Sequence, residues 1–147
     1  MTGDTVLKAD GPKSLRILVV DDHEIFRTQV CALLESQPGF EVICEAGDGL
    51  EAVRHAQELQ PDIVVLDITM PVLGGIEAAV RIRRVAPKAQ IVFLSQYDSE
   101  AVARAALATG ALAYVTKSSA ATDLIPVVQS VSDGKEFVSK LTRGGHD

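Results

Sequence analysis

The sequence predicts an α/β fold in which a five-stranded parallel sheet is covered by helices on both faces. Short apolar runs rich in Val and Ile alternate five times with amphipathic stretches, as expected of repeated strand–helix units. The first and third runs, LRILVV and DIVVLD, are nearly continuous, which is typical of strands buried on both faces. The 147 residues, of which 47% are hydrophobic, suffice for one domain with a full core.

Each element follows from its local pattern and from the residues that end it. The expected strands cover residues 15–20, 40–46, 62–67, 89–95 and 111–117. The expected helices cover residues 23–37, 49–60, 74–86, 99–110 and 122–134. Gly110 stops the fourth helix, and Pro61 follows the second. Helical spacing predicts buried faces carrying Ile25, Val30, Leu33 and Leu34 in the first helix and Ile76, Val80 and Ile82 in the third.

Pro126 conflicts with the pattern of the fifth helix. Proline lacks the N–H needed for a helical hydrogen bond, and its ring crowds the preceding turn. A helix that starts at Ser119 or Ala120 must therefore kink at Pro126. A start near Thr122 or Asp123 puts Pro126 in the first turn or at its edge, where it costs much less. We favour the later start.

Composition and charge exclude several classes of protein. The net charge of −6 argues against nucleic-acid binding by this domain alone, since such binding needs Lys and Arg to neutralise phosphates. There is no apolar run of the roughly 20 residues that span a bilayer and no signal peptide, so we expect a cytoplasmic protein without a membrane partner. Cys31 and Cys44 are expected to be buried free thiols. We expect one domain at 14–138, between a flexible segment at 1–13 and a linker or tail at 139–147.

Polar residues stand at the ends of four of the five expected strands. Asp21 and Asp22 follow the first, and Asp67, Ser95 and Lys117 end the third, fourth and fifth. The carboxyl ends of parallel strands meet at one edge, where open α/β sheets bind their ligands. Crowded carboxylates repel unless a cation lies among them, and oxygen-only ligands favour Mg²⁺. The lysine suggests that the site also takes up negative charge, as a phosphoryl group on one aspartate would supply.

Five motifs, in this order, resemble the receiver domain of bacterial two-component response regulators. They are VVDDHEIFR, DIVVLDITMP, the GG pair that follows it, IVFLS and GALAYVTKS. The sequences of these motifs are similar to those of the NarL/FixJ subfamily, whose receivers precede a helix-turn-helix DNA-binding domain. The resemblance covers about Leu15 to Val138 and implies a (βα)5 flavodoxin-like receiver fold.

The resemblance assigns residues to a phosphorylation and metal site. Asp67 would be the phospho-acceptor and would also contact Mg²⁺. Asp22 would bind Mg²⁺ directly, and Asp21 would complete the acid pocket, partly through water. The backbone carbonyl of Thr69 would be a further metal ligand. Pro71 and the Gly pair after it would shape a loop that leaves room for the phosphoryl group.

The resemblance also implies a switch. Ser95 would turn inward to meet the phosphoryl group, Lys117 would pair with it, and the ring of Tyr114 would rotate as Ser95 moves. A histidine kinase would donate the phosphoryl group, and the surface of the fourth helix, fifth strand and fifth helix would change. That surface would control an output partner or domain, and the expected output is transcription. It could instead form a homodimer on phosphorylation. The domain would take part in its own phosphorylation and dephosphorylation without being an enzyme with a separate substrate.

Some positions depart from the common pattern, and two other functions stay open. Gln96 stands where a small residue is usual and could narrow access to the phosphoryl group, and Ser118 replaces a frequent proline. A phosphohydrolase of the haloacid-dehalogenase type would need a D-x-D pattern after the first strand, whereas Thr69 stands two positions after the acid of the third. A pseudo-receiver that only binds partners is disfavoured by the intact acid set. His23 is expected to be a solvated residue of the first helical turn.

Overall fold

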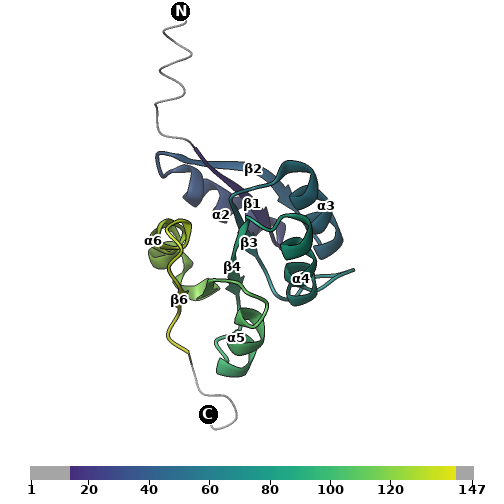
Figure 1. Cartoon of the computed structure of the whole chain (residues 1–147). Helices are drawn as coiled ribbons and strands as arrows, with labels where there is room; N and C mark the ends of the chain where they lie inside the picture. Colours follow the sequence, from purple (N-terminus) through teal and green to yellow (C-terminus); the bar gives the residue numbers. More distant parts are fainter. Residues whose placement is uncertain (1–13, 142–147) are drawn as a thin grey trace, which may run out of the picture.

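The computed structural model describes residues 14–141 and contains a parallel sheet with the strand order β2-β1-β3-β4-β5-β6 (Figure 1). The strands are β1 Leu15–Val20, β2 Phe40–Ala46, β3 Ile63–Leu66, β4 Gln90–Ser95, β5 Ala113–Thr116 and β6 Phe137–Val138. The helices are α2 Glu24–Glu35, α3 Gly49–Leu59, α4 Gly75–Val85, α5 Glu100–Leu107 and α6 Ala120–Ser132, with a 3-10 turn, η1, at Lys117–Ser119. The predicted α/β fold is confirmed, with one short strand more than expected.

Two apolar layers hold the sheet between its helices. The helices α2 and α6 cover one face, and α3, α4 and α5 cover the other (Figure 1). Alternate residues of β1 serve the two layers, with Leu18 and Val20 toward α3–α5 and Ile17 and Val19 toward α2 and α6. All residues of the central strand β3 are buried, which explains its continuous apolar sequence. No helix in the described part of the chain is long and apolar enough to cross a membrane.

The expected late start of the last helix is wrong. The helix α6 begins at Ala120, directly after η1, and contains Pro126 in its interior. Ala120 in the first turn and Leu124 in the second are buried against the sheet, so the start of the helix contributes apolar burial that offsets the cost of the proline. Pro126 and Thr122 are exposed, and water can therefore reach the Thr122 carbonyl that lacks a helical donor.

The expected burial of Ile25 is also wrong, because its side chain is 78% exposed. The buried residues of α2 are Val30, Cys31 and Leu34. Ile25 precedes Leu34 by nine positions, which is a rotation of about 180° from it at 3.6 residues per turn. Ile25 therefore points away from the sheet.

The two cysteines are free, as expected, but the expected burial of Cys44 is wrong, because Cys44 is only partly buried. Cys31 on α2 is buried, and this burial raises the pKa of its thiol to about 12. A thiol that stays protonated is a poor nucleophile, so Cys31 acts as a small apolar side chain of the core.

The strand β6 was not expected, because two residues are too few to produce a periodic pattern. Phe137 and Val138 pair in parallel with Ala113 and Tyr114 of β5. Ser139, which was expected to belong to a linker or tail, is buried and hydrogen-bonded to β5. The expected flexible segment at 1–13 and residues 142–147 of the expected tail lie outside the described residues.

Candidate functional site

The register of the central strands brings the predicted acids together. Val20 of β1 pairs with Leu66 of β3, so the next residues, Asp21 and Asp67, leave the sheet side by side. The backbone N–H of Asp67 donates to the carbonyl of Val20 at 3.0 Å, which extends the pairing to the acid itself. The two strands lie where the strand order reverses, at the carboxyl edge of the sheet.

Three carboxylates and one imidazole form a cluster at this edge. Single ligand atoms of Asp21, Asp22, His23 and Asp67 all lie within 4.8 Å of one another. Asp21 and Asp67 are buried, and Asp22 is exposed. The side chain of His23 is 62% exposed, as expected, yet its Nδ1 lies 3.2 Å from Asp21 and 3.3 Å from Asp22. Carboxylate oxygens in this number and spacing fit a hard divalent cation such as Mg²⁺.

Lys117 provides the positive charge of the cluster. Its Nζ lies 2.8 Å from Oδ2 of Asp21 and 3.4 Å from Oδ2 of Asp67. The same ammonium lies 4.7 Å from the centre of the Phe26 ring, a cation–π contact with α2. The side chain is only 14% exposed, so solvent screens these interactions weakly. The predicted convergence of Asp21, Asp67 and Lys117 is therefore present in the structure.

The environment of Asp67 favours the uncharged carboxyl. Burial raises the pKa of Asp67 above its usual range, and the negative charge of Asp21 raises it further. The Lys117 ammonium and the N–H of Ile68, which donates to Oδ1 at 2.8 Å, lower this pKa but do not cancel the increase. Without a metal ion, ionisation of Asp67 therefore destabilises the folded state. A cation bound among the acids would remove this destabilisation.

This shift predicts how stability depends on pH in metal-free buffer. A raised pKa in the folded state means that the stabilising contribution of protonated Asp67 is lost as pH rises from its ordinary value, 3.8, through the folded value. The side chain of Asp67→Asn stays neutral at every pH, so the variant does not lose this contribution to stability. Its free energy of unfolding, relative to wild type, should therefore increase as pH rises from 4 to 7, measured by urea denaturation with EDTA. A difference that is constant over this range, or the same increase in Asp62→Asn, would contradict the assignment.

The loop after β3 is held close to Asp67 by a glycine. The N–H of Gly75 donates to the carbonyl of Ile68 at 2.7 Å. A Cβ added to Gly75 would overlap the carbonyl oxygen of Asp67. Within this loop, the N–H of Leu73 donates to the carbonyl of Pro71, which closes a three-residue turn centred on Val72. The φ of Val72 is +71°. A β-branched residue at positive φ in a three-residue turn is strained, so the closely packed ends of the loop determine its path.

Three predicted residues, Ser95, Thr69 and Tyr114, are linked through Tyr97. The buried hydroxyl of Ser95 accepts a hydrogen bond from the Tyr97 N–H at 3.1 Å. The hydroxyl of Tyr114, which is fully buried, donates to the Tyr97 carbonyl. The Thr69 hydroxyl donates to the Tyr97 phenol at 3.3 Å. The sequence marked Ser95, Thr69 and Tyr114 but did not predict that Tyr97 links them, because two of the three contacts of Tyr97 use its backbone.

Arg27 is a second residue that the sequence did not single out. Its guanidinium donates to Glu45 at 2.8 Å and to the backbone carbonyl of Asp21 at 2.7 Å. The position of Arg27 six residues after Asp21, one helical turn into α2, was the available signal. Arg27 therefore fixes the backbone that presents Asp21 to the cluster.

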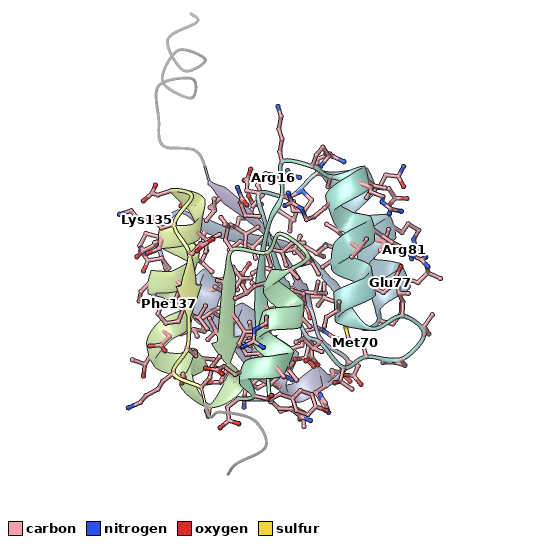
Figure 2. The ribbon with its side chains drawn as sticks, turned by 60° about the horizontal axis from the view of Figure 1, so that its bottom comes forward. Arg16, Met70, Glu77, Arg81, Lys135 and Phe137 are labelled. Atoms are coloured by element: carbon pink, nitrogen blue, oxygen red, sulfur yellow. The ribbon has the colours of Figure 1, made fainter. Side chains whose placement is uncertain are left out.

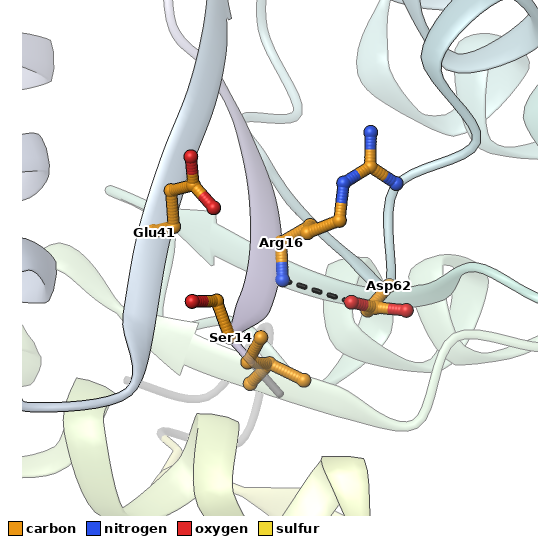
Figure 3. A pocket seen from close by; sticks show the side chains of 5 residues that line it. Ser14, Arg16, Glu41 and Asp62 are labelled. Carbon is orange, nitrogen blue, oxygen red and sulfur yellow. Dashed lines mark hydrogen bonds between the residues drawn. The ribbon is translucent and has the colours of Figure 1, made fainter. Parts of the chain in front are cut away.

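The opposite edge of the sheet uses its charged groups to close the fold. Figure 2 shows Arg16 near the top of the domain and Met70, three residues after Asp67, in its lower half. The backbone N–H of Arg16 donates to Asp62 at 2.8 Å (Figure 3), and its guanidinium donates to the carbonyls of Leu59 and Gln60 at the end of α3. A hollow of about 580 Å³ there is lined by Ser14, Leu15, Arg16, Glu41 and Asp62. Because Arg16 and Asp62 are already bonded within the fold, this hollow does not compete with the acid cluster as the functional site.

Comparison with known proteins identifies the family. Residues 17–129 match the response regulator receiver domain, and the chain belongs to this family. The chain is 38% identical over 130 residues to the transcriptional regulatory protein LiaR of Bacillus subtilis, covering 88% of this chain and 62% of LiaR. The chain spans about three fifths of the length of the first curated relatives that it matches.

Solved structures agree with this assignment and with the NarL/FixJ resemblance. A LuxR-family response regulator from Aurantimonas sp. SI85-9A1 is 40% identical, with a TM-score of 0.82 over 86% of this chain and 91% of that chain. The receiver domain of the response regulator NarL from Mycobacterium tuberculosis is 30% identical, with a TM-score of 0.80 over 84% of this chain and all of that chain. This chain is thus a two-component receiver domain, a signalling module and not an enzyme in the usual sense.

The cofactor of this class of site is Mg²⁺. A solved CheX–CheY complex from Borrelia burgdorferi contains beryllofluoride and Mg²⁺. One chain of it is 31% identical to this chain, with a TM-score of 0.72 over 83% of this chain and 90% of that chain. The acid cluster of the present chain has the oxygen ligands that Mg²⁺ requires. Which of Asp21, Asp22, Asp67 and the Thr69 carbonyl contact the ion stays a prediction.

Proposed function

We propose that Asp67 is the phospho-acceptor of this receiver domain and that a histidine kinase is its phosphoryl donor. An oxygen of Asp67 forms a bond to phosphorus while the bond from phosphorus to the donor nitrogen breaks, and the donor imidazole leaves with the electron pair. Bound Mg²⁺ would neutralise charge on the phosphoryl oxygens. The observation that carries the proposal is the joint contact of one ammonium, Lys117, with the two buried carboxylates of Asp21 and Asp67.

The other residues of the site would bind the metal ion or the phosphoryl group, in roles that their positions support. Asp22 is the exposed acid of the cluster and would be a direct metal ligand, while Asp21 is buried beside Lys117 and would complete the site. The Thr69 carbonyl follows Asp67 by two residues and would add a further oxygen. Lys117 would pair with the phosphoryl group in place of the free carboxylate.

We also propose the switch and the output. Ser95 would turn its hydroxyl toward the phosphoryl group, and Tyr114 would move with it, because both residues are bonded to Tyr97. The surface of α5, β5 and α6 would then change and regulate an output domain, a partner or a homodimer. Transcription through a DNA-binding effector domain in a longer chain is the output that this proposal favours, and the cytoplasmic location expected from the sequence is part of it.

Acetyl phosphate tests the proposal without knowledge of the kinase. With Mg²⁺ present, wild-type protein should gain about 80 Da, one phosphoryl group, in an intact mass spectrum. Asp67→Asn keeps the shape of the side chain and removes the nucleophile, so it should gain nothing. Asp62→Asn, at the opposite edge of the sheet, is the matched control and should label as wild type does. Equal labelling of wild type and Asp67→Asn would show that Asp67 is not the acceptor.

A further inference from the structure

The segment Phe137–Leu141 is attached to the edge of the sheet by a small set of contacts. The N–H of Phe137 donates to the carbonyl of Leu112 at 3.0 Å, and that of Ser139 donates to the carbonyl of Tyr114 at 2.8 Å. In return, the hydroxyl of Ser139 accepts the N–H of Thr116 at 3.1 Å. Figure 2 shows Phe137 on the strand that runs along this edge.

Burial along the segment is uneven. Ser139 is 5% exposed, and Leu141 packs against the apolar layer that contains Tyr114. Val138 is 42% exposed, Lys140 is exposed, and Phe137 is only partly buried. A strand of two residues with so little buried apolar area has a low free energy of local opening. The segment can therefore detach while the rest of the sheet stays intact.

The segment contacts the residues through which the phosphorylation site meets β5. Ser139 is bonded to both Tyr114 and Thr116, and Thr116 directly precedes Lys117. Thr116 also pairs with Ser95 in the register of β4 and β5. A movement of Lys117 or Ser95 is therefore passed first to Thr116, through the peptide bond to Lys117 or the strand pairing with Ser95. From Thr116 it reaches Ser139 through one hydrogen bond.

We propose that the segment Phe137–Leu141 is a detachable edge strand that phosphorylation releases from β5. This inference rests on the proposed function of Asp67. The docked contacts belong to a state in which Lys117 holds two carboxylates and Ser95 accepts the N–H of Tyr97. A phosphoryl group on Asp67 draws both side chains away from these partners. The anchors of Tyr114 and Thr116 then weaken, and with them the two residues that hold Ser139.

Thermodynamic linkage gives a direct test, because coupling between two sites is reciprocal. If phosphorylation weakens docking, a variant with weaker docking must bind a phosphoryl mimic more tightly. Ser139→Ala removes the acceptor for Thr116, and Phe137→Ala removes the partly buried ring. Each should lower the beryllofluoride concentration for half-saturation, measured by ¹⁹F NMR with Mg²⁺, by about two- to fivefold. This is the effect of one lost hydrogen bond for Ser139→Ala and of lost apolar contact for Phe137→Ala. Ser132→Ala, whose hydroxyl bonds only within α6, should bind as wild type does.

Hydrogen exchange on the wild-type chain gives a second readout. The amides of Phe137 and Ser139 should exchange faster with beryllofluoride than without it. Unchanged or slower exchange, or unchanged or weaker mimic binding by both variants, would overturn the release of this segment while leaving the role of Asp67 intact. If wild type itself binds no beryllofluoride, the proposed function and this inference both fail. The two failures are therefore distinguishable.

Discussion

Gly75→Ala is expected to destabilise the folded domain by about 3 kcal/mol, because a well-packed site with backbone on its far side cannot make room for a methyl group. The added Cβ would overlap the carbonyl oxygen of Asp67 and crowd the Cα of Ile68. Gly75 is the first residue of α4, where alanine would ordinarily be the better helix former. A loss of stability therefore reports the close approach and not helix propensity. Urea denaturation measures it.

Gly74→Ala is the matched control for this prediction. Its added Cβ would lie 3.5 Å from the Ile68 carbonyl, an ordinary contact, and its φ of −68° suits any residue. We expect a loss of about 1 kcal/mol, the cost of replacing glycine at a helix N-cap by alanine, which is a poorer cap. Equal stability of Gly75→Ala and Gly74→Ala would show that the loop can move away from Asp67. The phosphorylation loop would then be less rigid than its packing indicates.

Lys117→Met is expected to have the second large effect, and the size of its destabilisation should depend on Mg²⁺. Methionine keeps most of the stem over Phe26 and removes the ammonium that holds Asp21 and Asp67. Breaking a buried ion pair from one side costs about 3 kcal/mol, so the variant should be much less stable in EDTA. Mg²⁺ would then supply the missing positive charge. The increase in melting temperature on adding millimolar Mg²⁺ should be larger in the variant than in wild type.

The exposed residue Lys135 provides the comparison. Lys135→Met removes the same charge from the surface and should leave both the stability in EDTA and the Mg²⁺ response as in wild type, within about 0.5 kcal/mol. If Mg²⁺ raises the melting temperature of Lys117→Met no more than that of wild type, the metal does not bind beside Lys117. The acid cluster would then have to be rejected as the metal site.

The sequence predicted the acid cluster because its position follows from topology. In a parallel sheet, the residues that follow neighbouring strands meet at one edge, which places Asp21 beside Asp67. Lys117 follows β5, which β4 separates from β3, and its long side chain reaches both acids. The link through Tyr97 could not be predicted, since backbone contacts carry most of it. The exposure of Ile25 shows that apolar residues at roughly helical spacing do not all share one face.

Two errors near the C-terminus have a common origin. A proline inside a pattern reads as a helix boundary, yet burial of Ala120 and Leu124 decided where α6 begins. The strand β6 has too few residues for any periodic signal, and its pairing with β5 depends on contacts far apart in the sequence. Local patterns therefore gave the order of the elements, while tertiary packing set their ends.

The strand β6 also has a consequence for how this domain behaves in concentrated solution. The residues of β5 are all buried, and β6 pairs with the side of β5 away from β4. A chain that ends before Phe137 would leave that side as a bare strand edge with unpaired N–H and C=O groups. Such edges add strands from other molecules and promote aggregation. While it is docked, the short segment after α6 therefore protects this edge of the sheet from pairing with other molecules.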